Sequence, residues 1–229
     1  MRRPPIVTHV RRLGPTTIGG ELRRRLASEE VNFGLRCELE RLPPLKQARI
    51  PLTLGRCDGS FNGFRVELER TSGADYGRVL RRQKLHAQAL PSMYVALNAE
   101  AAPVYVQWLM TSADQITFGD SSQLWFPLKP DEVLLEFAYT FTPFRGFGVM
   151  GDAMGRLLRV AAQSGARWAR TYVSDDNIPS LRGCSKVGFE LDHVRTTTNR
   201  LGTVRNRFAA PAEGDRQRWE QATVARASA

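Results

Sequence analysis

Residues 145–154 read RGFGVMGDAM, and the part between Gly146 and Gly151 has the spacing G-x-G-x-x-G. Glycines at this spacing let a backbone come close to a pyrophosphate. The first N–H groups of a following helix then point at the phosphate oxygens, and the helix dipole favours the negative charge. The stretch therefore predicts a loop that binds a phosphate-bearing cofactor, but its glycines alone do not distinguish a dinucleotide from another pyrophosphate.

The chain on either side of this stretch argues against a dinucleotide-binding fold. A doubly wound sheet begins at such a turn and needs several further strand–helix units, with an acidic residue about 20 positions past the motif. Asp175 lies further along than that, and too few residues follow it to build those units. Segments 93–98 and 104–110 also predict an antiparallel hairpin, which that fold does not place before its first phosphate turn. We therefore expect neither NAD nor NADP to bind.

Hydrophobic periodicity around the stretch predicts a sheet with flanking helices. Segment 132–141 (EVLLEFAYTF) is the most apolar in the chain and is typical of a central strand buried on both faces. Apolar residues recur at helical spacing from Ala153 to Ala162, and Gly165 is placed to end that helix. The other expected strands are 31–39, 49–57, 64–70, 93–98, 104–110, 167–174, 189–198 and 203–209, and the other expected helices are 74–89 and a short one within 175–188. A long connection at 111–130 holds Trp125 and Phe126, and the tail after Pro211 is expected to be a frayed helix or disordered.

Two motifs in this order resemble the GNAT superfamily of acyl-CoA-dependent N-acyltransferases. Arg145, Gly146 and Gly148 resemble the R-x-x-G-x-[GA] loop of that family, and residues 177–189 (NIPSLRGCSKVGF) resemble its N-x-x-[AS]…K-x-G-F element. The resemblance covers roughly residues 62–208. It implies an α/β (α+β) fold with a mixed, mostly antiparallel central sheet flanked by helices. The expected organisation is a basic N-terminal extension with one or two strands at 1–60, an acyltransferase domain at 61–210 and a polar C-terminal tail at 211–229.

The resemblance also implies an activity, which is direct transfer of an acetyl or longer acyl group from a phosphopantetheine thioester to an amine. It implies acyl-CoA as the co-substrate and no metal. The residues implied to bind the cofactor are Phe141, Arg145, Gly146, Phe147, Gly148, Val149, Met150, Gly151, Asn177 and Ser180. An ordinary helix start at 145–151 and simple helix capping by Asn177 are the structural alternatives.

Two residues depart from the family pattern. Met150 stands where Gly or Ala is usual, so the loop is expected to sit differently on the phosphates. Cys184 stands where many members carry a general-acid Tyr. These departures leave open a non-catalytic module that binds acyl-CoA or another partner.

Amide formation from a thioester needs a neutral amine, stabilisation of an oxyanion and a proton for the departing thiolate. Glu136 lies within the apolar segment 132–141, where burial would raise the pKa of its carboxyl and let it accept the ammonium proton. A salt-bridged structural glutamate is the alternative. Cys184 is the candidate acid, with an ordinary thiol pKa of about 8.5, and its alternative is a small buried hydrophobe.

The composition fits an enzyme-sized domain. A chain of 229 residues with 42% hydrophobic side chains can build one sizeable core. No apolar run approaches the ~18 residues of a membrane-spanning helix, and the N-terminus lacks an apolar signal segment, so we expect a cytoplasmic protein. Cys37, Cys57 and Cys184 form no C-x-x-C pair, and His9, His86 and His193 form no ligand set.

The net charge of +10 and the pI of about 10.2 predict attraction to anionic partners. Acyl carrier proteins and the phosphates of coenzyme A are such partners. Nucleic acid is not the partner we expect, because no zinc, helix-turn-helix or RNA-stacking signature accompanies the basic residues. An arginine excess that reflects only coding bias is the alternative. The sequence leaves open a carrier-protein donor, the acceptor amine and a homodimer.

Overall fold

The computed structural model describes residues 27–57, 61–87, 92–117, 127–201 and 203–224. The chain divides into two compact units, of which the first comprises residues 1–29, 57–91 and 198–205, and the second comprises residues 30–56, 92–197 and 206–229. All the candidate site residues named above lie in the second unit.

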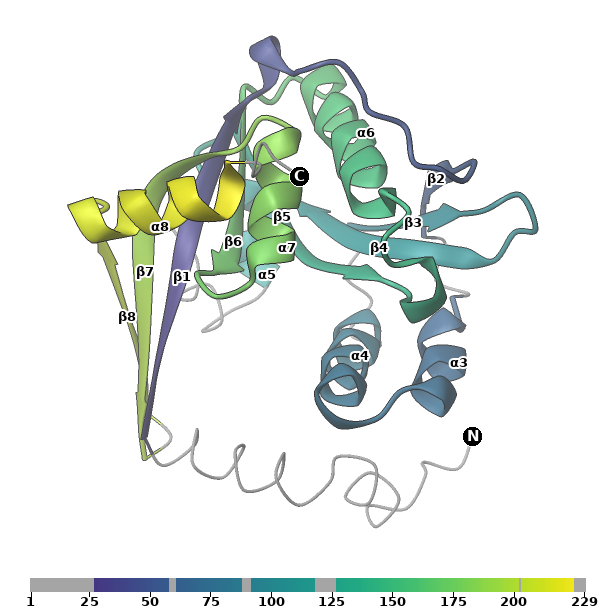
Figure 1. Ribbon diagram of the computed structural model, residues 1–229, viewed down its shortest axis with the longest axis horizontal. Coiled ribbons are helices and arrows are strands. Elements are labelled where there is room, and N and C mark those ends of the chain that lie inside the picture. The colour runs from purple at the N-terminus through teal and green to yellow at the C-terminus, as the bar shows by residue number, and fades with distance from the viewer. Residues whose placement is uncertain (1–26, 58–60, 88–91, 118–126, 202, 225–229) are drawn as a thin grey trace, which may run out of the picture. The chain divides into compact units, whose positions relative to one another are not determined.

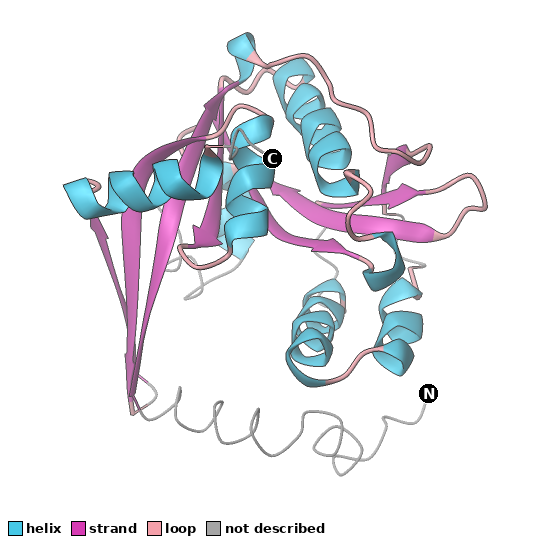
Figure 2. Cartoon of the chain, in the orientation of Figure 1, coloured by secondary structure: helices cyan, strands magenta, loops and turns pink. Residues whose placement is uncertain are grey.

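Figure 1 labels the helices and strands, and Figure 2 shows their types. The strands are β1 (Ala27–Glu38), β2 (Thr53–Arg56), β3 (Met93–Leu97), β4 (Pro103–Met110), β5 (Glu132–Thr140), β6 (Trp168–Ser174), β7 (Glu190–Arg200) and β8 (Thr203–Ala209). The α-helices are α3 (Gly63–Arg70), α4 (Gly73–His86), α5 (Ser112–Thr117), α6 (Val149–Gln163), α7 (Ile178–Lys186) and α8 (Glu213–Thr223), and the short 3₁₀ helices are η1 (Leu39–Arg41) and η3 (Thr142–Phe144).

The strands form one sheet in the order β2-β3-β4-β5-β6-β1-β7-β8. Strands β5 and β6 are parallel, whereas β2–β3, β3–β4, β4–β5 and β1–β6 are antiparallel. The predicted hairpin is β3–β4, in which Met93 pairs with Trp108. The expectation of a mixed, mostly antiparallel sheet with helices is therefore confirmed.

Strand β1 lies inside the sheet, between β6 and β7. It pairs antiparallel with β6 from Asn32↔Ser174 to Glu38↔Trp168. The sequence predicts this strand but not its place. Residues 27–56, which belong to the expected N-terminal extension, thus supply both an inner strand and the edge strand β2.

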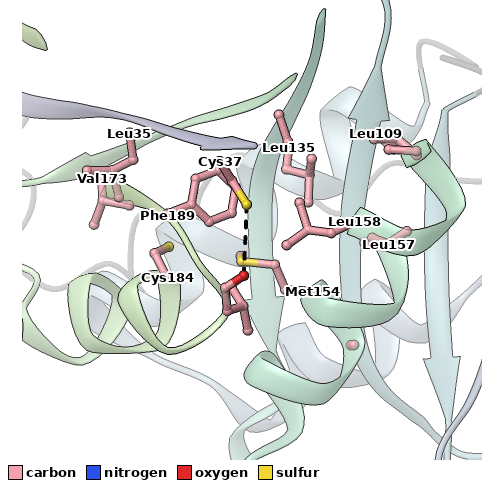
Figure 3. Close-up of a cluster of buried hydrophobic side chains, with 14 of the residues drawn as sticks. Leu35, Cys37, Leu109, Leu135, Met154, Leu157, Leu158, Val173, Cys184 and Phe189 are labelled. Carbon is pink, nitrogen blue, oxygen red and sulfur yellow. Dashed lines mark hydrogen bonds between the residues drawn. The ribbon is translucent and has the colours of Figure 1, made fainter. Parts of the chain in front are cut away.

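Helices α6 and α7 pack on one face of the sheet. Helix α6 forms where the periodicity predicts it, and its buried residues include Ala153, Leu157 and Ala161. Gly165 follows it with φ +88°, a backbone conformation that favours glycine and ends helices. Figure 3 shows the core beneath the two helices, with these labelled residues: Leu35, Cys37, Leu109, Leu135, Met154, Leu157, Leu158, Val173, Cys184 and Phe189.

The structure corrects one predicted element and defines another. Residues 64–70, predicted as a strand, belong to α3, which buries Phe64, Glu67 and Leu68. The tail after Pro211 forms α8, and the Arg182 side chain of α7 donates a 2.8 Å hydrogen bond to the Ala222 carbonyl of α8. Within the connection 111–130, residues 112–117 form α5, and Trp125 and Phe126 lie outside the described residues. Among the helices described, none has the length and apolarity that crossing a membrane requires.

Candidate active site

The glycine loop turns from β5 into α6 through two left-handed residues. Gly146 has φ +83° and Gly148 has φ +80°, and Gly148 is the N-cap of α6. An L-residue with a side chain adopts such a φ only at a cost, which explains the glycine at both positions. The N–H groups of Val149, Met150 and Gly151 follow in the first turn, where an α-helix offers them no intrahelical acceptor. This arrangement suits a phosphate group.

Arg145 lies exposed at the start of the loop and is tied back to the end of β5. Its Nη2 donates to the Tyr139 hydroxyl at 3.3 Å, and its Nε donates to the Thr140 carbonyl at 3.3 Å. Its guanidinium carbon lies 5.4 Å from the centroid of the Tyr139 ring. These contacts hold a cation beside the glycines.

A second cation, Arg49, reaches the loop from the segment between η1 and β2. Its Nη2 donates to the Gly146 carbonyl, and its backbone N–H donates to the Phe147 carbonyl at 2.9 Å. Its guanidinium carbon lies 5.4 Å from the centroid of the Phe147 ring. The sequence carries no signal for this residue, because nothing in its spacing connects it to a loop almost a hundred residues away.

The residues that flank Arg49 fix this segment to α6. Asp152, which is only 1% exposed, accepts a 2.9 Å hydrogen bond from the Ala48 N–H and a 2.6 Å hydrogen bond from Arg156 Nε. A hollow of about 400 Å³ opens beside them, lined by Gln47–Leu52, Asp152 and Arg156. It adjoins the first turns of α6 but is lined by neither Glu136 nor Cys184.

Met150, which departs from the family pattern, points toward α7. A Cβ added to Gly183 would lie 3.1 Å from the Met150 Sδ and Cε atoms, so the side chain of Met150 packs against a glycine of the next helix. The larger side chain thus has a complementary glycine on α7.

Strands β5 and β6 part in the middle of the sheet. Parallel pairs join Glu132, Val133 and Leu134 to Trp168, Ala169 and Arg170, and no further pair joins the two strands over their described lengths. On the other side of β5, the register against β4 shifts between Val106 and Trp108, and Phe137 has a left-handed φ of +57°. A β-bulge and a strained non-glycine residue are both common beside functional sites.

Glu136 lies where the two strands part. Its Oε1 accepts a 2.8 Å hydrogen bond from the backbone N–H of Tyr172 on β6, so the carboxylate takes the place of a strand partner. After the bulge the burial along the strand is uneven, since Phe137 is half-buried while Tyr139 and Phe141 are buried. The structure therefore brings the candidate base to the gap between β5 and β6, and its role as a base stays a prediction.

Cys184 lies in the core, with none of its surface exposed (Figure 3). Burial, followed by the nearby charge of Glu136 and by Cys37, raises the pKa of its thiol to about 12. A thiol with that pKa is a poor proton donor to the departing thiolate, because the conjugate thiol of that thiolate is the stronger acid. The geometry therefore favours the alternative named above, a small buried hydrophobe.

The remaining candidates lie at the starts of two helices. Asn177 is the N-cap of α7, and its Oδ1 accepts the Ser180 N–H at 3.4 Å, so it does cap that helix. Phe141 is 3% exposed, and its backbone N–H donates to the Val104 carbonyl at 3.0 Å. Because β5 and β6 are parallel neighbours, the starts of α6 and α7 lie at the same edge of the sheet. Contacts of these residues with a cofactor stay predictions, and no cluster of metal-binding side chains occurs in the described ranges.

The sequence matches no protein-family model and no curated protein. Solved structures, by contrast, share its fold. A GCN5-related glucosamine N-acetyltransferase region of a fungal multi-domain GH3 β-N-acetylglucosaminidase is 12% identical over 81% of this chain and 23% of that chain, with a TM-score of 0.54. A GNAT-family acetyltransferase from Colwellia psychrerythraea is 14% identical over 76% of this chain and 57% of that chain, with a TM-score of 0.50.

These likenesses establish the fold of the chain. It has the GNAT fold, as the two sequence motifs led us to expect. The chain spans less than two thirds of the length of either structure. The activities of those proteins are therefore not carried over to this chain, and its function is argued from its own residues.

Proposed function

We propose that this protein is an N-acyltransferase that moves an acyl group from the thioester of acyl-CoA to an amine by direct transfer. The observation that carries the proposal is the left-handed glycine loop between two arginines at the start of α6. Such a loop supplies backbone N–H donors and positive charge to a pyrophosphate. In the same unit, a carboxylate lies in the gap between β5 and β6.

In this proposal the chain's own residues bind the donor and move one proton. Arg145, Arg49 and the N–H groups of the loop hold the pyrophosphate, and the thioester reaches the gap beside Glu136. The Glu136 carboxylate accepts the proton that the ammonium must lose before its nitrogen can attack. The acceptor is an amine, and the acyl group is acetyl or longer.

The experiment that tests this function measures binding and turnover separately. Calorimetric titration with acetyl-CoA should show binding, and mass spectrometry should show acetylated product from at least one member of a broad panel of primary amines. Binding without turnover on the whole panel would favour the alternative, a non-catalytic module that binds acyl-CoA. Absence of acetyl-CoA binding would reject both.

Arg49 provides a test of the pyrophosphate assignment. Arg49→Glu should weaken acetyl-CoA binding about 10- to 100-fold, because a hydrogen bond to a charged group contributes about 1.5–3 kcal/mol. Arg41→Glu changes the net charge equally from an exposed position on η1, where Arg41 lies 3.3 Å from Glu38, and should change the affinity little. Equal weakening by both substitutions would show that net charge, and not the contact at Gly146, controls binding.

We also propose that an acyl carrier protein can serve as the donor. The net charge of +10 exceeds what one coenzyme needs, and a carrier protein presents a broad acidic surface beside the same phosphopantetheine arm. The specificity constant for the carrier-bound acyl group should exceed that for the same acyl group on CoA at low salt. That advantage should shrink at moderate salt, because the Debye length is only about 10 Å at 0.1 M. Free acyl-CoA that is at least as good at both salt concentrations would contradict this donor.

A further inference from the structure

A chain of hydrogen-bonded side chains crosses the sheet from β6 to β7. The Tyr172 hydroxyl lies 3.0 Å from His193 Nε2, and His193 Nδ1 lies 2.8 Å from Asp192 Oδ2. Arg170 donates one 2.8 Å hydrogen bond to Asp192 and another to Glu132. His193, Arg170 and Glu132 are all less than 9% exposed.

These hydrogen-bonded side chains lie on the sheet face opposite α6 and α7. Gly34 of β1 pairs with Tyr172 of β6, so the two residues share a face. Their neighbours Phe33, Leu35 and Val173 point to the other face and belong to the core beneath α6 and α7. In the proposed function the acyl-CoA lies at the face that carries α6 and α7. The hydrogen-bonded side chains then lie on the other face, from which the amine can reach the gap.

Gly34 makes the contact across β1 possible. Strand β1 separates β6 from β7, so the His193 ring must pass over β1 to reach Tyr172. A Cβ at position 34 would lie 2.3 Å from His193 Nε2 and 2.4 Å from His193 Cε1. Any other residue at this position would displace the ring.

The partners of His193 fix where its proton lies. Burial by itself raises the pKa of the Asp192 carboxyl, but the contacts with His193, Arg170 and Arg36 outweigh it and lower this pKa. Asp192 is therefore a carboxylate, which only accepts hydrogen bonds. His193 Nδ1 therefore carries the proton. Burial lowers the pKa of His193, and the charges of Arg170 and Arg195 lower it further. The carboxylate of Asp192 raises this pKa but does not outweigh the other effects. At neutral pH the imidazole is neutral, and its Nε2 accepts the Tyr172 O–H.

The charged and titratable groups around His193 come from every neighbouring strand. Arg36 lies on β1, Arg170 and Tyr172 on β6, and Asp192 and Arg195 on β7. The Arg195 guanidinium carbon lies 4.3 Å from the centroid of the Tyr172 ring. On β8 the facing residue is Phe208, whose ring centroid lies 5.7 Å from that of His193. The pH behaviour of His193 is set by this group of residues.

Tyr172 also touches the proposed active site. Its backbone N–H donates to Glu136 Oε1, and the last β5–β6 pair is Leu134↔Arg170. Tyr172 and Glu136 therefore each lie two residues past the point where the strands part. The backbone of Tyr172 thus lies at the gap beside Glu136, and its hydroxyl contacts the imidazole of His193.

We infer that Tyr172 is a second catalytic group of the proposed acyl transfer, with His193 and Asp192 as positioning residues. The inference rests on the proposed function. Glu136 takes the proton that the ammonium loses before attack. Once the nitrogen–carbon bond has formed, the nitrogen gives a second proton to the Tyr172 oxygen as the Tyr172 hydroxyl proton moves to His193 Nε2. The carbon–sulfur bond then breaks, and its electron pair leaves on sulfur. The resulting thiolate takes the proton held by Glu136. The imidazolium of His193 releases its proton to water.

The test compares variants of the full chain with acetyl-CoA and the amine that turns over fastest in the panel. Tyr172→Phe and His193→Gln should lower kcat/KM about 100-fold or more, as expected for loss of a general base. Acetyl-CoA affinity should stay within about threefold, because neither side chain contacts the phosphate loop. Thr197→Val is the control, because Thr197 lies on β7 outside the relay formed by Tyr172, His193 and Asp192. The substitution removes the hydrogen bond that Thr197 donates to Asn206 of β8, and it should keep normal kcat/KM.

Two further variants should move the acidic limb of the kcat/KM profile in opposite directions. Asp192→Asn removes the carboxylate that raises the pKa of His193, so the limb should shift to lower pH. Arg195→Gln removes a charge that lowers this pKa, so the limb should shift to higher pH. A merely structural role for these residues would move the limb in neither direction.

A spectroscopic measurement tests the arrangement without turnover. The ¹⁵N shifts of the His193 ring, assigned by their loss in His193→Gln, should show the proton on Nδ1 at neutral pH. A proton on Nε2, or unchanged kcat/KM in both Tyr172→Phe and His193→Gln, would overturn the relay alone. Absence of acetyl-CoA binding by the unaltered protein would instead overturn the proposed function.

Discussion

Gly148→Val is expected to lower the affinity for acetyl-CoA about 100-fold or more while the chain stays folded. Gly148 has φ +80° at the N-cap of α6, and a β-branched residue cannot hold that conformation without strain. The strain moves the N–H groups that follow, several of which would bond the pyrophosphate at about 1.5–3 kcal/mol each. Calorimetric titration measures the affinity, and circular dichroism checks the fold.

Gly165→Val is the matched control at the other end of the same helix. Gly165 has φ +88°, and a Cβ there would meet no atom within 4 Å, so valine suffers the same backbone strain in open space. Each left-handed non-glycine residue costs about 1–3 kcal/mol, which a domain stable by about 5–15 kcal/mol can tolerate. Only Gly148→Val should lose binding. Equal loss in both variants would mean that α6 as a whole, and not the loop, had been disturbed.

Glu136→Gln is expected to lower kcat about 100- to 10,000-fold with little change in acetyl-CoA affinity. Glutamine keeps the Oε1 atom that accepts the Tyr172 N–H at 2.8 Å, so the shape of the gap is retained. What is lost is a carboxylate able to take a proton, and proton transfer by a positioned group contributes about that much. Steady-state kinetics over a range of pH, with separate calorimetry, measure the two quantities.

Two comparisons make the role of Glu136 decidable. Glu136→Ala removes both the proton acceptor and the hydrogen-bond acceptor of the Tyr172 N–H. This variant should therefore lose stability as well as turnover. Cys184→Ala should affect turnover less than Glu136→Gln does, because the thiol is buried away from solvent. If Gln and Glu give equal rates across pH, Glu136 serves only to hold β6.

The elements that local signals specify were predicted well. The loop at 145–151 and the start of α7 carry glycine, asparagine and proline at positions with a fixed conformational meaning, and each lies where the sequence indicated. The error at 64–70 shows the limit of such signals. Phe64, Val66 and Leu68 alternate like a strand, yet the chain buries Phe64 with Leu68 at helical spacing and leaves Val66 43% exposed. Periodicity in so short a segment fits both structures, and tertiary packing decides between them.

Two contacts at the candidate site that the sequence did not predict join segments far apart in the chain. The segment before β2 brings Arg49 to the glycine loop, and the strand order brings His193 to Tyr172. His193 looked isolated in the sequence, since its hydroxyl partner is 21 residues away and a third strand lies between them. No local rule assigns such a pair.

The inner position of β1 has a consequence for how the protein is made. β1 leaves the ribosome long before its neighbours β6 and β7 are synthesised. The Cys37 thiol of β1, for example, lies against the carbonyl of Val187, 150 residues later. Pairing over such separations is slow, and an unpaired strand can join another chain in the meantime. The nascent protein therefore carries β1 with both edges unpaired until β6 and β7 have been synthesised, and strands in that state are prone to aggregation.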